Sequence, residues 1–121
     1  MPRVADYKII KDDKFTLTST PPGNFHEEEF KLDSPHVGGP SILALRLDYV
    51  DADHFEFNVK VNGTPVLLAK YSGGGFFTIH TVIDANVLKA KEPNSIQFIV
   101  TNLPSGSVRI SDIVLWYQHE V

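Results

Sequence analysis

The stretch LALRLDYVDADHFEFNVKVNG (residues 43–63) decides the fold of this protein. Apolar residues occupy every second position from Leu43 to Tyr49, and the same alternation with polar residues returns from Phe55 to Val61. A period of two is typical of strands that turn one face to a core and the other to solvent. The pair Asn62-Gly63 follows at once and favours a type I′ hairpin turn, because both residues tolerate positive φ. The stretch therefore predicts two half-buried strands, the second of which leads into a hairpin.

The same period recurs along most of the chain, and turn residues separate the apolar runs at short spacing. The alternation predicts further strands at Val4–Ile10, Phe15–Ser19, Glu27–Leu32, Val66–Tyr71, Phe76–Asp84, Ser95–Thr101 and Val108–Tyr117. We expect the first two of these to form an opening hairpin through the charged turn at residues 11–14. Asp84 should cap a single helical turn that ends near Lys89. About eight or nine strands without a regular helix predict an all-β antiparallel sandwich with a jelly-roll topology.

The last strand changes phase within its length. Its apolar residues fall on even positions up to Ile110 and on odd positions from Ile113 to Tyr117. A β-bulge near residues 111–112 would turn both sets to the core and leave Val114 and Trp116 outside. Without a bulge, Trp116 belongs to the core.

The composition is that of one folded domain over residues 1–121, with 42% hydrophobic and 21% charged residues. The net charge of -4 offers no basic surface to a phosphate backbone, so we expect no nucleic-acid partner. No apolar run approaches the ~18 residues of a membrane span, so we expect no membrane partner. Because the N-terminus lacks a signal peptide, we expect a cytoplasmic protein or a domain excised from a secreted one.

Five short segments carry a resemblance to a known family. They form a hairpin turn, an inner strand, a loop that closes on an Asn, and a bulged final strand: FNVKVNG (57–63), FTI (77–79), VLK (87–89), NSIQF (94–98) and VRISDIVL (108–115). They resemble the galactose-binding-like jelly-roll superfamily, which includes many carbohydrate-binding modules. The resemblance implies sugar binding through end loops or an open sheet face, and in many members a structural calcium ion. The family usually has Gly before the Asn of this loop, where this chain has Pro93.

Outward-facing polar side chains are the first candidates for a ligand site. They come from strands that we expect to be neighbours in one sheet: Arg46, Asn58, Lys60, His80 and Gln97. Such side chains can hydrogen-bond the hydroxyl groups of a sugar, although any solvated sheet face has a similar composition. Trp116 and Tyr71 are candidate stacking platforms for a sugar ring. The alternatives are a core position for Trp116 and an anchoring role for Tyr71 beside the flexible glycine run.

Asp48, Asp51 and Asp53 concentrate carboxylates at one predicted turn, next to His54. Calcium binds several oxygen ligands at close quarters, so this turn is a candidate calcium site. Its spacing lacks the glycine and the terminal glutamate of a calcium loop, which leaves a solvated acidic turn as the alternative.

These observations are consistent with three alternative functions. The first hypothesis is a non-catalytic carbohydrate-binding module or small lectin with a saccharide ligand. The second is a structural domain that forms a homo-oligomer through apolar outward residues, namely Ile42, Val82, Ile99 and Val114. The third is a small hydrolase or cyclase on the same scaffold, for which Glu27 and Asp51 would be paired carboxylates.

Overall fold

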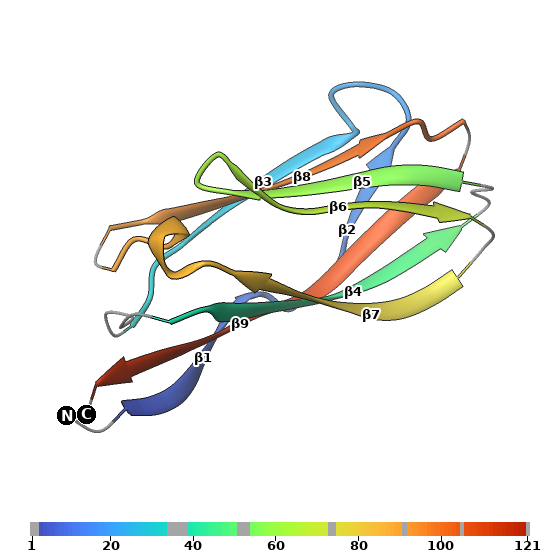
Figure 1. Cartoon of the computed structure of the whole chain (residues 1–121). Helices are drawn as coiled ribbons and strands as arrows, with labels where there is room; N and C mark the ends of the chain where they lie inside the picture. Colours follow the sequence, from blue (N-terminus) through green and yellow to red (C-terminus); the bar gives the residue numbers. More distant parts are fainter. Residues whose placement is uncertain are drawn as a thin grey trace.

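The computed structural model describes residues 3–33, 39–50, 54–72, 75–90, 92–104 and 106–120, and these residues form two stacked antiparallel sheets (Figure 1). The five-stranded sheet contains β1 (Arg3–Lys11), β9 (Ser107–Glu120), β4 (Ser41–Val50) and β7 (Gly75–Ile83) in this order, and β2 (Phe15–Thr18) also pairs with β9. The four-stranded sheet has the order β3 (Phe25–Phe30), β8 (Asn94–Thr101), β5 (His54–Val61) and β6 (Thr64–Ser72). The predicted all-β antiparallel jelly-roll sandwich is confirmed.

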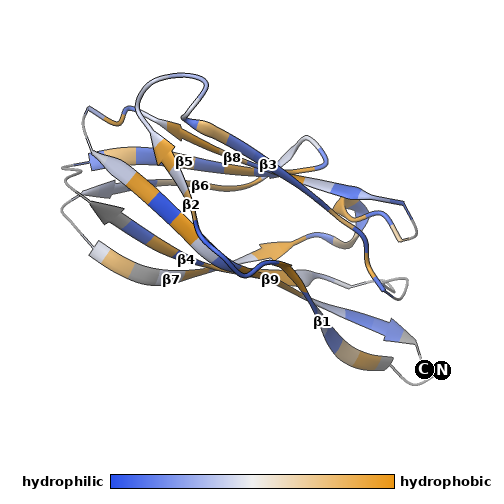
Figure 2. Ribbon diagram, turned by 180° about the vertical axis from the view of Figure 1, so that it is seen from behind, coloured by the Kyte–Doolittle hydropathy of each residue, from blue (hydrophilic) through white to orange (hydrophobic). Residues whose placement is uncertain are grey.

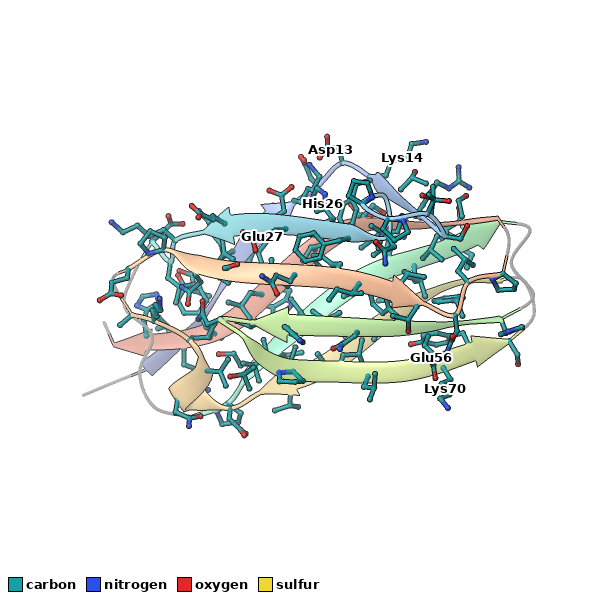
Figure 3. The ribbon with its side chains drawn as sticks, turned by 90° about the horizontal axis from the view of Figure 1, so that it is seen from above. Asp13, Lys14, His26, Glu27, Glu56 and Lys70 are labelled. Atoms are coloured by element: carbon teal, nitrogen blue, oxygen red, sulfur yellow. The ribbon has the colours of Figure 1, made fainter. Side chains whose placement is uncertain are left out.

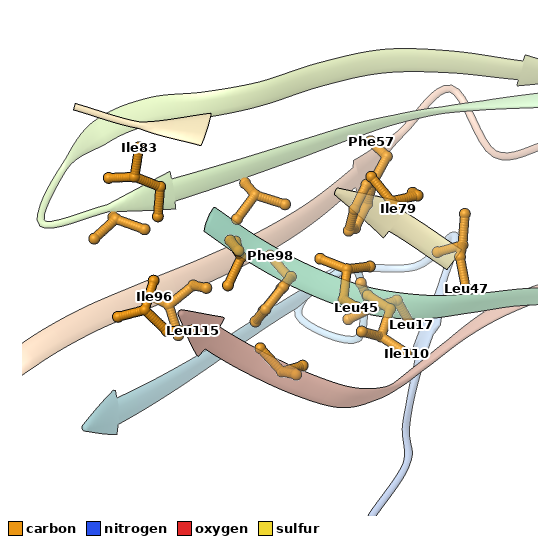
Figure 4. Close-up of a cluster of buried hydrophobic side chains, with 14 of the residues drawn as sticks. Leu17, Leu45, Leu47, Phe57, Ile79, Ile83, Ile96, Phe98, Ile110 and Leu115 are labelled. Atoms are coloured by element: carbon orange, nitrogen blue, oxygen red, sulfur yellow. The ribbon is translucent and has the colours of Figure 1, made fainter. Parts of the chain in front are cut away.

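The core lies between the two sheets and is built from alternate residues of nearly every strand (Figure 4). Phe57 and Phe98 from one sheet and Leu47 and Leu115 from the other are fully buried. Figure 2 shows this alternation as bands of opposite hydropathy along the strands. In β7, Ile79 and Ile83 face inward, whereas Val82 lies on the outer face.

The predicted bulge in β9 is confirmed. Ala44 of β4 pairs with Val114 and Arg46 pairs with Ser111, so three residues of β9 span the length of two in β4. Asp112 takes a φ of 52° at this point. The extra residue restores the phase, and Ile110 and Ile113 are both completely buried.

The predicted opening hairpin is wrong, because β1 and β2 do not pair with each other. Both run antiparallel to β9, with Tyr7 opposite Trp116 and Leu17 opposite Val108. β9 has 14 residues, enough to accommodate both short strands one after the other. This arrangement buries Leu17, which is 1% exposed.

Polar contacts join the two sheets along both open sides of the sandwich. On one side Lys11 Nζ of β1 lies 3.3 Å from Glu28 Oε1 of β3. Burial would raise the pKa of Glu28, but hydrogen bonds from His26 and Lys11 outweigh it and hold the pKa below 4.5. On the other side Thr81 Oγ1 of β7 donates a 2.8 Å hydrogen bond to the carbonyl of Val66 in β6.

The short connection between β7 and β8 contains a 3-10 turn at Ala85–Val87, where we expected one helical turn. Asp84 occupies the capping position, as predicted, but its side chain makes no capping hydrogen bond. Its backbone carbonyl instead accepts a 3.1 Å hydrogen bond from the amide of Val87.

Two asparagine side chains tie this connection to the β5–β6 hairpin. Asn62 and Gly63 both have positive φ, as the predicted type I′ turn requires. Asn62 Nδ2 donates to Oδ1 of Asn94 and to the carbonyl of Val87, at 2.8 Å each. Asn94 is completely buried, accepts a hydrogen bond from the amide of Lys89 and donates one to its carbonyl. The two side chains thus provide hydrogen-bond partners for backbone amide and carbonyl groups in the connection between β7 and β8.

We expect Asn94→Ala to lower the free energy of unfolding by about 2 kcal/mol, because it removes the hydrogen bonds that the buried Asn94 side chain makes to the backbone of Lys89 and to the side chain of Asn62. Chemical denaturation of both proteins at neutral pH measures the difference. Asn86→Ala is the matched control on the same connection, where the side chain is exposed, and should change the stability by less than about 0.5 kcal/mol. Equal stability of the Asn94→Ala variant and the parent protein would contradict this role.

Candidate functional site

A groove of about 870 Å³ opens at one end of the four-stranded sheet. Its lining comes from the start of β5, the end of β6, the end of β8 with the loop that follows it, and the β2–β3 connection. The described lining residues are Ser19, Asn24, His54, Phe55, Glu56, Lys70, Tyr71, Ser72, Val100, Thr101, Asn102, Leu103 and Pro104. A concave surface with an apolar floor and a few convergent polar groups is the usual form of a small-molecule site.

Glu56 is the polar centre of this groove. Lys70 Nζ lies 3.1 Å from its carboxylate, Thr101 Oγ1 donates a 3.4 Å hydrogen bond, and Asn102 Nδ2 donates another. The hydrogen bond from Lys70 holds the pKa of Glu56 below its ordinary value of 4.5. The groove therefore presents an ionised carboxylate in a fixed position at neutral pH. Figure 3 shows Glu56 and Lys70 next to each other on adjacent strands.

Hydrogen bonds between β8 and the β2–β3 connection hold the other wall of the groove. The amide of Val100 donates a 3.0 Å hydrogen bond to the carbonyl of Asn24, and Asn24 Nδ2 donates back to the carbonyl of Val100 at 3.4 Å. Gly23 precedes Asn24 in a tight turn, where a Cβ atom would lie 2.4 Å from Oγ1 of Thr18. A larger residue at this position would have to displace the hydroxyl of Thr18, and its Cβ atom would lie 3.1 Å from the carbonyl oxygen of Thr20.

Tyr71 joins the aromatic lining of the groove to the core. Its side chain is half-buried, and its ring centroid lies 5.2 Å from that of Phe55, with 31° between the planes. The residue lies within β6 rather than in the glycine loop that follows it. It is therefore an anchored ring whose exposed part lines the groove.

The polar side chains that we expected in one sheet lie on two opposite faces of the molecule. Arg46 in β4 and His80 in β7 belong to the five-stranded sheet. The four-stranded sheet carries the other three predicted residues: Asn58, Lys60 and Gln97. The prediction of one polar strip is therefore wrong. The alternation shows that these residues face outward but not which strands are neighbours.

One of the three predicted residues on the four-stranded sheet makes a side-chain hydrogen bond to the neighbouring strand. Gln97 lies between Lys60 and Glu27 in the strand register, and its Nε2 donates a 2.6 Å hydrogen bond to Glu27. Asn58 lies between Leu68 and Ile99, which are apolar. None of these residues is among the described lining of the groove.

Trp116 lies on the outer face of the five-stranded sheet, as the bulge predicts, and is 47% exposed. Its ring centroid is 5.3 Å from that of Tyr7 in the neighbouring strand. This aromatic pair belongs to the opposite sheet from the groove, so Trp116 and Tyr71 do not form one platform.

Asp51 and Asp53 lie outside the described residues, so the predicted calcium turn is described at Asp48 and His54 alone. The carboxylate of Asp48 forms an ion pair with Arg109 on the outer face of the five-stranded sheet. In the part of the chain that the structure describes, no three His, Asp or Glu side chains gather as they would around a metal ion.

Sequence reasoning missed Glu56, Lys70 and Asn102. The alternation placed Glu56 on an outer face but gave no reason to prefer it to other outward residues. Its partners come from the end of β6 and from the turn after β8, where Asn102 has a φ of 52°. An Asn directly after a strand is a turn signal that is visible in the sequence, but its proximity to Glu56 depends on the pairing of β5 with β8.

No protein-family model and no curated protein matches this sequence. Solved structures do match its fold. Dimeric latent PorU from Porphyromonas gingivalis matches 99% of this chain with a TM-score of 0.79 at 10% identity, and this chain spans 13% of PorU.

Two smaller sugar-binding structures also match. The C-terminal domain of EclA, described as a sugar-binding protein, matches 95% of this chain and 79% of its own, with a TM-score of 0.57 and 8% identity. The carbohydrate-binding module CBM36, solved with calcium and xylotriose, matches 98% of this chain and 100% of its own, with a TM-score of 0.52 and 9% identity. The fold is that of a carbohydrate-binding-module-like jelly roll.

Among the described residues of this jelly roll, no helix is long and apolar enough to cross a membrane.

We expect Lys70→Met to raise the pKa of Glu56 toward 4.5, because it removes the hydrogen bond and the charge that favour the carboxylate. NMR titration of the Glu56 carboxyl carbon measures the pKa in both proteins. A lowered pKa stabilises the fold at pH values above 4.5, and this contribution disappears as the pH falls through the pKa of the folded state. Lys60→Met, on the outer face of the same sheet, is the control and should leave the Glu56 titration unchanged. An unaltered titration in Lys70→Met would remove Lys70 as the cause.

Proposed function

We propose that this jelly roll is a non-catalytic saccharide-binding module and that the groove around Glu56 and Tyr71 is its binding site. The observation that carries the proposal is the ionised carboxylate of Glu56, held by three neighbours, in a groove of about 870 Å³ whose lining also includes Tyr71. Sugars combine hydroxyl groups, which need directed hydrogen bonds, with an apolar ring face that packs on aromatic side chains. The groove offers both kinds of contact.

In this proposal Glu56 accepts a hydrogen bond from a hydroxyl group of the sugar. An ionised carboxylate has about four acceptor positions. The contacts with Lys70, Thr101 and Asn102 use three of them and orient the group, so about one remains for the sugar. The side-chain oxygen of Asn102 and the exposed amine of Lys70 add further hydrogen-bonding capacity beside it. Tyr71 contributes the exposed part of its ring.

The fold likeness supports the same class of ligand. Two matching structures are described as a sugar-binding protein and as a carbohydrate-binding module in complex with xylotriose. Likeness at this level of identity supports the scaffold, whereas the choice of site rests on the residues of this chain. We propose the groove and not the polar residues of the sheet faces, because Arg46, Lys60 and Gln97 lie on two separate faces.

The proposal includes a test of whether saccharide binding depends on calcium. CBM36 was solved with calcium. In this chain Asp51 and Asp53 lie three residues and one residue before His54, which lines the groove. If these carboxylates hold calcium, saccharide binding will fall when a chelator removes the ion and return when the ion is added.

A glycan array followed by calorimetry with the best oligosaccharide tests the proposed site. We expect Tyr71→Ala and Glu56→Gln each to weaken binding by about tenfold or more, because they remove the stacking ring and the charged acceptor. Trp116→Ala is the matched aromatic control on the opposite sheet. In calorimetry with an oligosaccharide that fits a single groove, it should bind like the parent protein. The array is run with calcium and with a chelator.

Each outcome of this experiment has a defined meaning. Loss of binding in Trp116→Ala with full binding in Tyr71→Ala would move the site to the five-stranded sheet and overturn the groove assignment. No binding to any glycan by the folded protein would overturn the function. Release of reducing sugar during the assay would favour the hydrolase hypothesis.

A further inference from the structure

The outer face of the five-stranded sheet carries an apolar patch that is independent of the groove. One row crosses the sheet in strand register, from Tyr7 through Trp116 and Ile42 to Val82. The adjacent row contains Ile9, Val114, Ala44 and His80. The patch therefore extends over β1, β9, β4 and β7 without a carboxylate, Lys or Arg in either row. We refer to these eight residues as the apolar face.

The apolar face has the size of the largest apolar patch on a typical monomer, and such patches are often functional. Five of its side chains, Tyr7, Ile9, Ile42, Val82 and Trp116, are each 45% to 60% exposed. Together they expose on the order of 400 Å² of apolar area, which is as large as the largest patch on a typical monomer. A stable interface buries about 800 Å² on each partner, so this patch is sufficient for the centre of one.

The composition of the apolar face fits a protein partner better than a sugar. Aromatic and branched aliphatic residues with few charges are typical of the core of a protein interface. A sugar needs hydrogen-bonding groups around the aromatic ring, whereas the neighbours of Trp116 on both sides within its row are Tyr7 and Ile42. Two apolar sheet faces pack well on each other, as the two sheets of this molecule do inside its core.

The charges beside the apolar face are arranged so that a second copy of this chain can match them. In the next row Arg46 of β4 lies beside Asp112 of β9, with Nη1 3.3 Å from Oδ2. Further along, Asp48 of β4 forms an ion pair with Arg109 of β9. Each of these two rows thus has a base on one strand and an acid on the other.

Two copies can pack with their apolar faces against each other about a two-fold axis. The axis runs parallel to the strands, midway between the two sheets, over the space between β9 and β4. This symmetry places β9 of one copy over β4 of the other. Every row then faces the same row of the second copy. Trp116 lies over Ile42 and Tyr7 over Val82, so that large apolar groups meet. Arg46 lies over Asp112, and Asp48 lies over Arg109, so that opposite charges meet in both polar rows.

We propose that the apolar face joins two copies of this chain about this axis. The centre of the interface is the row that contains Trp116 and Ile42, and the ion pairs of the neighbouring rows set its register. The groove on the other sheet takes no part in the contact, so this proposal stands or falls separately from saccharide binding.

Sedimentation equilibrium over concentrations up to about 1 mM tests the association. We expect a reversible dimer in the micromolar range, because the apolar area is at the lower end for a stable interface. Ile42→Glu should raise the dissociation constant by at least about tenfold, since it buries a charge at the centre. Leu68→Glu is the control on the outer face of the other sheet, where Leu68 is 75% exposed, and should dimerise like the parent protein.

A mixing experiment tests the register of the dimer. Arg46→Asp and Asp112→Arg each place like charges opposite each other in their own homodimers, so each variant alone should remain largely monomeric. Mixed in equal amounts, they pair Asp at position 46 with Arg at position 112 and the native Arg46 with the native Asp112. We therefore expect mixed dimers to form at least about tenfold more tightly than either homodimer.

Circular dichroism must show a folded sheet protein for each variant, because Asp112 has a φ of 52° that a larger residue adopts with strain. If Asp112→Arg does not fold, Asp48→Arg mixed with Arg109→Asp tests the same axis. A parent protein that is monomeric at about 1 mM overturns the proposal. A dimer that Ile42→Glu leaves intact would also overturn it, and so would a mixture that associates no better than its components.

Discussion

One extra residue in β9 determines which side chains face the core and which face solvent. The bulge at Ser111 and Asp112 allows the strand to bury Val108 and Ile110 before it and Ile113, Leu115 and Tyr117 after it. Without the bulge, one of these two groups would be exposed, at a cost of about 1.5–3 kcal/mol for each large side chain. The strained φ of Asp112 costs about 1–3 kcal/mol, so the bulge is favourable on balance. It also places Trp116 on the outer face, where the apolar face forms around it.

The periodicity of the sequence predicted most of the strands and this bulge, because both are local features. A period of two shows which side chains share a face, and a change of phase shows where the ladder gains a residue. Periodicity does not identify the partner of a strand. The opening hairpin was therefore wrong: the charged residues 12–14 interrupt two strands that both pair with β9. The single polar strip was wrong for the same reason, since Arg46 and Asn58 face outward on different sheets.

The candidate site could be predicted in part, and the limit again lies in contacts between distant segments. Tyr71 was identified from its aromatic side chain, and the structure places it in the lining of the groove. Glu56 became a candidate once the structure brought Lys70 and Asn102 to it, 14 and 46 residues further along the chain. Asn62 is a further example of a contact that the sequence does not show. The Asn62-Gly63 pair predicted a hairpin turn, but not the hydrogen bond from the Asn62 side chain to Asn94.

The groove and the apolar face lie on opposite sheets, and this separation has a consequence for binding. The groove is lined by β5, β6, β8, the loop after β8 and the β2–β3 connection, whereas the apolar face belongs to β1, β9, β4 and β7. A dimer through the apolar face would therefore leave both grooves open, on the outer sides of the assembly. A polysaccharide that reaches both grooves would bind the second as an intramolecular step, which raises the overall affinity without any new contact. A weak site with one carboxylate and one aromatic ring would gain most from this arrangement, although each of the two proposals rests on its own residues and is tested separately.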